Sequence, residues 1–177
     1  MSVDDFINLI RKSTQHIYLY HFTDHANFPS ISQNGLLSKE QMRKRGLWPP
    51  LKTGGNALSH SLDLQCGVDP YVSLCFTRNH PMKFLAVSDG RLTDPRYLAI
   101  DPSVLTLPGV RVTMGVANSN NVENLSVQEA LAKLDAEVIY TRTDWSDPEV
   151  NLRLRAAEKC EILVPNQVPV EYIKGFY

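Results

Sequence analysis

A charged, helix-compatible segment that runs directly into a short apolar strand near the C-terminus constrains the fold most. The strand covers 161–164 and stops at Pro165. Side chains alternate faces along a strand, so Cys160, Ile162 and Val164 should share one face, and Glu161 should point to the other. A carboxylate that opens such a strand lies either at a wet sheet edge or in a cleft, because unpaired glutamate is almost never fully buried.

The rest of the chain alternates short strands with short helices. Apolar and β-branched runs predict strands at 16–23, 71–77, 97–100, 110–114, 136–140, 161–164 and 172–176. Apolar periodicity and capping residues predict helices at 3–13, 27–33, 81–86, 126–134 and 149–157. The order lacks the βαβ rhythm of a parallel sheet. We therefore expect an α+β fold with mainly antiparallel pairing, in a single domain over 1–177.

Residues 38–70 differ from the regular segments around them. They are basic near their start, and Pro49-Pro50 and Gly54-Gly55 interrupt regular structure. We expect a long loop here. A loop of this length is either a solvated insertion or a mobile functional segment, and the sequence leaves both interpretations open.

Composition excludes several classes of protein. Hydrophobic residues make up 43% and charged residues 21%, and the net charge of −1 gives no global attraction to nucleic acid or membrane. Three cysteines without CxxC spacing suggest neither disulfides nor zinc, and the five histidines lack metal-ligand spacing. No signal peptide, apolar span or nucleotide-binding glycine motif is present. We expect a cytoplasmic protein that uses no metal and no membrane.

Three stretches taken in order resemble one family. They are 19–24 (LYHFTD) with the trailing NGLL of 34–37, 74–82 (LCFTRNHPM), and 157–165 (AEKCEILVP) with VP at 168–169. Together they resemble the DarT-type ADP-ribosyltransferase toxins, which modify bases in single-stranded DNA. The resemblance implies an ADP-ribosyltransferase-like split antiparallel β-sandwich with short flanking helices, with NAD as co-substrate in the cleft. It also implies a toxin or phage-defence role and a macrodomain antitoxin as a possible partner.

The resemblance also implies site residues. Cleavage of the nicotinamide–ribose bond passes through an oxocarbenium-like transition state, so a fixed carboxylate is needed, and Glu161 is the candidate, with Glu158 as its rival. His21 and Thr23 are expected beside the nicotinamide-side ribose. Phe76 could stack on nicotinamide or simply be core, and Arg78 could pair with the pyrophosphate, orient the acceptor or lie at the surface.

The acceptor side is the least determined part of the sequence. Arg142, Arg153 and Arg155 are candidates for nucleic-acid binding, with Tyr140 and Trp145 as stacking aromatics, although a solvated helix face would look the same. The same fold could instead act on RNA or protein, merely hydrolyse NAD, or persist as an inactive NAD-binding module. The combination of His21, Arg78 and Glu161 argues for an active enzyme.

Overall fold

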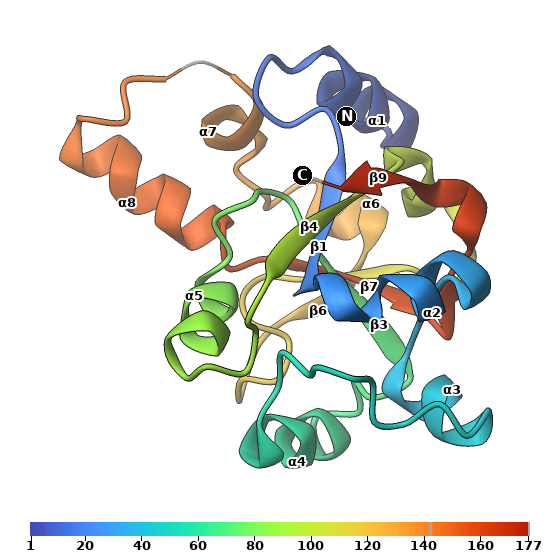
Figure 1. Ribbon diagram of the computed structural model, residues 1–177. Helices are drawn as coiled ribbons and strands as arrows, with labels where there is room; N and C mark the ends of the chain where they lie inside the picture. Colours follow the sequence, from blue (N-terminus) through green and yellow to red (C-terminus); the bar gives the residue numbers. More distant parts are fainter. Residues whose placement is uncertain (142, 177) are drawn as a thin grey trace.

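Seven strands form the main sheet of the computed structural model, which describes residues 1–141 and 143–176 (Figure 1). Their order is β6-β5-β7-β3-β1-β4-β9, and β2 pairs separately with β8. Every strand pair within the described residues is antiparallel, as the sequence predicts. The strands are β1 (Leu19–Asp24), β2 (Leu36–Leu37), β3 (Tyr71–Cys75), β4 (Pro95–Ile100), β5 (Arg111–Thr113), β6 (Asn124–Ser126), β7 (Glu161–Pro165), β8 (Gln167–Val168) and β9 (Ile173–Phe176).

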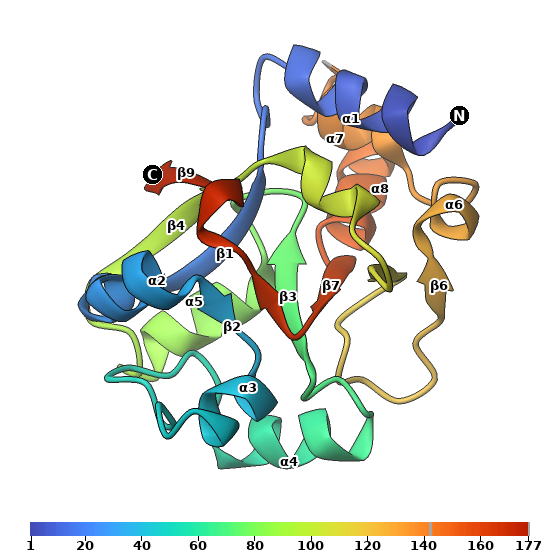
Figure 2. The same ribbon diagram turned by 90° about the vertical axis from the view of Figure 1, so that its right-hand side faces the viewer.

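Short helices surround the sheet. The α-helices are α1 (Val3–Lys12), α2 (Phe28–Asn34), α3 (Lys39–Lys44), α4 (Ala57–Gln65), α5 (Pro81–Ser88), α6 (Val127–Ala130), α7 (Ala136–Tyr140) and α8 (Pro148–Ala157). Three 3₁₀ helices are η1 (His25–Asn27), η2 (Pro102–Thr106) and η3 (Val170–Tyr172). Helix α1 lies at one end of the molecule and α3 and α4 lie at the other, as both Figure 1 and Figure 2 show.

The main sheet opens along a seam between β1 and β3. These strands share one Cα pair, Tyr20 with Cys75, whereas β1 pairs with β4 over six residues and β3 with β7 over five. The main-chain ladder therefore divides the sheet into a β4-β1 side and a β3-β7 side. This division is the split that the sequence analysis expects, and it leaves space for side chains between two strand edges.

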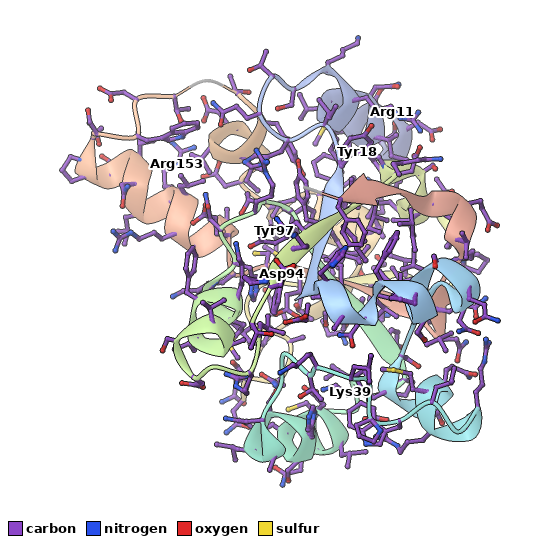
Figure 3. The ribbon with its side chains drawn as sticks, viewed as in Figure 1. Arg11, Tyr18, Lys39, Asp94, Tyr97 and Arg153 are labelled. Carbon is purple, nitrogen blue, oxygen red and sulfur yellow. The ribbon has the colours of Figure 1, made fainter. Side chains whose placement is uncertain are left out.

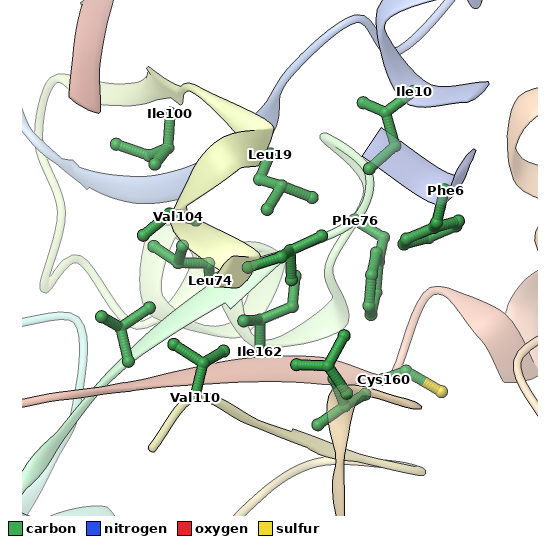
Figure 4. Close-up of a cluster of buried hydrophobic side chains, with 14 of the residues drawn as sticks. Phe6, Ile10, Leu19, Leu74, Phe76, Ile100, Val104, Val110, Cys160 and Ile162 are labelled. Atoms are coloured by element: carbon green, nitrogen blue, oxygen red, sulfur yellow. The ribbon is translucent and has the colours of Figure 1, made fainter. Parts of the chain in front are cut away.

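Strand β7 shows the expected alternation of faces. Cys160, Ile162 and Val164 belong to the main hydrophobic core, where Cys160 and Ile162 appear with Phe6 of α1 in Figure 4. Leu163 packs in a small separate cluster, and Glu161 faces a cavity. The apolar face of β7 thus anchors the strand in the core, and this fixes the carboxylate on the opposite face.

Three expectations about secondary structure are wrong. The helix expected over 126–134 is shorter, because α6 ends at Ala130. Residues 136–140 form helix α7 and not a strand, because Asp135 caps the helix and Arg153 pairs with Asp135 and Glu137. The segment 38–70 is not one long loop, because it contains α3 and α4, whose N-caps are the side chains of Ser38 and Asn56. The stretch between these two helices remains irregular.

Candidate active site

A cavity of about 250 Å³ lies at the seam between β1 and β3. Its wall includes His21 and Thr23 of β1, Ser73 and Cys75 of β3, and Glu161 of β7. We call it the main cavity. Residues predicted from the first and third sequence motifs thus meet here, because β1, β3 and β7 are consecutive strands of the split sheet.

His21 spans the seam. Its Nδ1 lies 2.9 Å from the carbonyl oxygen of Ser73, so Nδ1–H donates and the neutral ring keeps an acceptor lone pair on Nε2. Burial lowers the pKa of His21, while the Ser73 carbonyl and the charge of Glu161 act in the opposite direction. A neutral imidazole with a fixed tautomer can accept a hydrogen bond from a ligand hydroxyl.

Glu161 is the buried carboxylate of the main cavity. Its backbone is paired on both sides, with Cys75 of β3 and Thr113 of β5, so the position of the side chain is set by three strands. The residue is 7% exposed, and its Oε1 lies 3.1 Å from Nε2 of His80. A carboxylate held in such a wall can stabilise positive charge that develops beside it, since the low surrounding dielectric strengthens the interaction.

Thr23 is held in place by Asn27, a residue whose role at the site the sequence analysis missed. The Asn27 amide Nδ2 donates to Thr23 Oγ1 at 3.1 Å and to the Lys52 carbonyl at 2.7 Å. Asn27 Oδ1 in turn accepts from Lys52 N–H at 3.1 Å. One side chain therefore ties the end of β1 to the segment 38–70, and the position of Asn27 at the start of the predicted helix 27–33 was the only available signal.

The segment 38–70 forms one side of the main cavity. Lys39 pairs with Asp63 and Arg43 pairs with Asp69, and Asn118 donates to Asp63 at 2.8 Å. Burial lowers the pKa of Lys39 to about 8, although Asp69 nearby acts to raise it. The segment contributes several polar and aromatic side chains to the wall, among them Lys39, Trp48, Lys52, His60 and Asp63.

Phe76 does not reach the main cavity, contrary to the expectation that it stacks on a ligand there. Cys75 faces the cavity, and Phe76, one residue further along, points to the opposite side. Phe76 is 1% exposed and its ring lies 6.3 Å from that of Phe6 in the core (Figure 4). The aromatic residue of β1 that lines the cavity is Phe22.

Arg78 lies at a second cavity of about 320 Å³. This second cavity also contains His16, Asn79, Trp145 and Glu158. It lies across the short connection 78–80 from the main cavity, because His80 lines one and Arg78 with Asn79 lines the other. Arg78 therefore does not line the main cavity with His21 and Glu161, where it was expected to contact NAD.

The second cavity has its own carboxylate. Glu158, which follows α8, accepts a hydrogen bond from Asn79 Nδ2 at 3.1 Å, and burial raises its pKa. Burial also lowers the pKa of His16 to about 4, with a further contribution from Arg78. The two rival carboxylates of the sequence analysis are thus assigned to different cavities.

The three arginines expected to bind nucleic acid have different surroundings. Arg153 hydrogen-bonds Asp135 at 2.7 Å and Glu137 at 2.8 Å, and so joins α8 to α7 (Figure 3). Arg153 and the exposed Arg155 are not among the described residues that line either cavity. Arg142 lies outside the described residues. Of the two aromatics, Tyr140 is buried in the core and Trp145 lines the second cavity.

Two further features bear on the class of protein. Within 1–141 and 143–176, no group of three histidine, cysteine or acidic side chains is arranged to hold a metal ion. None of the helices in that part of the chain combines the length and the apolar character that a bilayer crossing requires.

Solved structures with the same fold include those of two DarT proteins. Thermus sp. 2.9 DarT in complex with ADP-ribosylated ssDNA is 21% identical, with a TM-score of 0.66, over 89% of this chain and 79% of that chain. The same Thermus protein in complex with NAD+ gives a TM-score of 0.62 at 20% identity, over 89% and 79%. Thermosipho africanus DarTG in complex with ADP-ribose is 19% identical, with a TM-score of 0.67, over 90% of this chain and 43% of that chain. These likenesses confirm the expected ADP-ribosyltransferase fold.

The family follows from the sequence match. No protein with a curated description matches the chain. The family model described as "ssDNA thymidine ADP-ribosyltransferase, DarT" matches residues 20–177, which is most of the chain and contains all three motifs of the sequence analysis except Leu19. The chain therefore belongs to the DarT family of NAD-dependent ADP-ribosyltransferases.

Proposed function

We propose that this enzyme holds the nicotinamide–ribose end of NAD in the main cavity and transfers ADP-ribose to thymidine in single-stranded DNA. The observation that carries the proposal is the placement of Glu161, a buried carboxylate that faces His21 and Thr23 across the seam of the sheet. The family description supplies the acceptor. The Thermus relative has been solved with NAD+ and with ADP-ribosylated ssDNA, which supports the same pair of substrates here.

The cavity suits one end of the dinucleotide. Pockets for drug-sized ligands typically enclose about 300–1,000 Å³, and the main cavity measures about 250 Å³. It therefore accommodates nicotinamide and its ribose, and the remainder of NAD would extend along 38–70, where Lys39 and Lys52 supply positive charge. His21 Nε2 and the Thr23 hydroxyl are the groups that would meet the ribose hydroxyls.

For this reaction the protein must supply a carboxylate that stabilises positive charge, rather than a strong nucleophile. The bond between nicotinamide and ribose C1′ breaks, and its electron pair leaves with nicotinamide. Positive charge on the ribose then interacts favourably with Glu161. A ring nitrogen of thymine forms the new bond to C1′ and loses its proton to the Glu161 carboxylate.

The second cavity is our candidate for the approach of DNA. Arg78 supplies a charge for phosphate, Trp145 a surface for stacking, and Asn79 with Glu158 hydrogen-bonding groups for a base. Only the short connection 78–80 lies between this cavity and the main cavity, which contains Glu161. A single DNA strand bound in the second cavity would thus bring a neighbouring base toward the main cavity.

A transfer assay with labelled NAD tests the proposal directly. Equal amounts of a thymidine-containing single-stranded DNA, the same DNA with every thymidine replaced by deoxycytidine, an RNA of equal length and a protein mixture are offered separately. Label on the thymidine-containing DNA alone is the expected result. Label on RNA or protein alone would overturn the acceptor, and nicotinamide release without transfer would indicate an NAD hydrolase.

The biological setting is part of the same proposal. We place the enzyme in the cytoplasm as a toxin or phage-defence effector, because its acceptor is DNA and its three cysteines are all free. A macrodomain antitoxin is proposed as its partner. The support is the structural match to Thermosipho africanus DarTG, because the match covers less than half of that longer chain. Growth arrest on expression, relieved by a Glu161→Gln substitution, would support the toxin role, and unimpaired growth with active enzyme would contradict it.

A further inference from the structure

We propose that His80 is a positioning residue that holds Glu161 in its reactive orientation; this inference rests on the role proposed for Glu161. His80 is 1% exposed and lies at the N-cap of α5, directly before Pro81. It contributes to the wall of the main cavity beside Glu161. Sequence analysis assigned it no role.

The start of helix α5 fixes which nitrogen of His80 carries a proton. Nδ1 accepts the backbone N–H of Met82 at 3.4 Å and thereby caps the helix. In the neutral ring the proton must then be on Nε2. The imidazolium form also carries a proton on Nε2, so His80 presents an N–H at this position in either charge state.

That N–H is directed to the neighbourhood of the carboxylate. Nε2 lies 3.1 Å from Glu161 Oε1, within the range of an ion pair. The approach is not aligned as a linear hydrogen bond, and Nε2 forms no hydrogen bond with any other described residue. We infer that rotation of the carboxylate aligns the two groups, because a buried N–H without a partner favours it.

The plane of the imidazole is fixed by stacking. The Phe22 ring lies 6.1 Å from that of His80, at an interplanar angle of 24°, and the His21 ring stacks on Phe22 at 6.2 Å and 12°. Phe22 belongs to β1, whereas His80 follows β3 and Glu161 begins β7. The orientation of the carboxylate is therefore set from both sides of the seam.

The chemical consequence concerns the two oxygens of Glu161. When His80 engages Oε1, Oε2 is left for the ribose whose charge develops during bond cleavage. Without His80 the carboxylate would be free to rotate, and misplacement by about 1 Å can cost on the order of a hundredfold in rate. The effect should therefore appear in kcat and much less in the binding of NAD.

Two substitutions separate this role from helix capping. Asparagine is a good N-cap, but its amide lies near the position of Nδ1 and does not reach Glu161. Glutamine places an amide near the position of Nε2 but is a poor cap. If His80 positions Glu161, His80→Asn should keep the melting temperature and the Kd for NAD and lose about ten- to a hundredfold in kcat. His80→Gln should melt earlier yet retain more kcat than His80→Asn.

The opposite order would overturn the proposal. A purely structural His80 predicts near-normal kcat in His80→Asn and the larger defect in His80→Gln. A double-mutant cycle adds a second criterion, because His80→Asn should cause little further loss in a Glu161→Gln background. A full further loss there would show that His80 acts independently of Glu161. Near-normal transfer by Glu161→Gln alone would instead refute the assignment of Glu161 and leave the His80 variants to be judged on their own kinetics.

Discussion

Glu158 and Glu161 are three residues apart in the chain but belong to different cavities. Glu161 lies on a strand that two neighbours, β3 and β5, hold in place, and its partner is the buried His80. Glu158 follows a helix and is bound by the exposed Asn79. The side proposed for catalysis is thus built from paired strands, whereas the side proposed for DNA is built from helix ends and connections.

The largest expected effect separates the two carboxylates. Glu161→Gln should keep the fold and most NAD binding but lose transfer by about a hundred- to thousandfold, since one preorganised electrostatic contact carries about 3–4 kcal/mol of barrier. Glu158→Gln, its matched control, should be far milder. Both are measured as base modification at saturating NAD. An inactive Glu158→Gln beside an active Glu161→Gln would reverse the roles of the two cavities.

The segment 38–70 provides the next test, because it lies on the NAD side alone. Its contacts to the rest of the protein include those of Asn27 and Asn118, and the part between α3 and α4 is irregular. NAD should slow amide hydrogen exchange in residues 45–56 by about tenfold or more, by analogy with loops that close over substrates. The α7–α8 region serves as the internal control. Equal exchange of 45–56 in both states would contradict closure.

A smaller effect, on DNA binding, should distinguish Arg78 from Arg153. Arg78→Gln should weaken single-stranded DNA binding several-fold and reduce the salt slope by about one, as expected for loss of one phosphate contact. Arg153→Gln should leave both nearly unchanged and instead lower the melting temperature, because it breaks ion pairs with Asp135 and Glu137. Fluorescence anisotropy across a salt series and thermal melts provide both measurements. A salt slope that changes only in Arg153→Gln would place DNA at α8.

The smallest effect concerns acid stability at the second cavity. The pKa of His16 is about 4 in the folded protein, below the usual 6.5. The unfolded chain therefore binds more protons than the folded protein between these pH values. The contribution of neutral His16 to the free energy of unfolding is thus complete above about pH 6.5 and is lost as the pH falls toward 4. The loss at pH 5 should be on the order of 1 kcal/mol after allowance for solvent screening. His16→Asn should show a smaller drop in melting temperature from pH 7.5 to 5, and an equal drop would show that His16 does not contribute.

Much of the fold follows from local patterns, because strands such as β7 carry their own signals. The alternation of Cys160, Glu161 and Ile162 predicts which side chain leaves the core. Helix α7 was missed because its apolar run at 138–140 is too short to show a helical period. Asp135 was the available capping signal, and it becomes decisive only together with Arg153.

The site was less predictable than the fold because it depends on distant contacts. His21 and Glu161 could be found from motifs, and both line the main cavity. The role of Asn27 depends on Lys52, 25 residues away, and the proximity of His80 to Glu161 depends on the pairing of β3 with β7. For Phe76 the motif was not enough. Side chains alternate along β3, so Cys75 faces the main cavity and the Phe76 ring packs in the core, away from the expected ligand.

The seam between β1 and β3 also affects how the protein opens. Because β1 and β3 share only one Cα pair, the two sides of the sheet can separate there at a lower free energy than complete unfolding requires. A dinucleotide that contacts both His21 and Glu161 would hold the two sides together. At a hundred times its Kd, such a ligand adds about 2.7 kcal/mol to the stability of the closed form. The supply of NAD would thus affect how often the folded enzyme opens as well as its rate, and depletion of NAD would leave the enzyme more exposed to proteolysis.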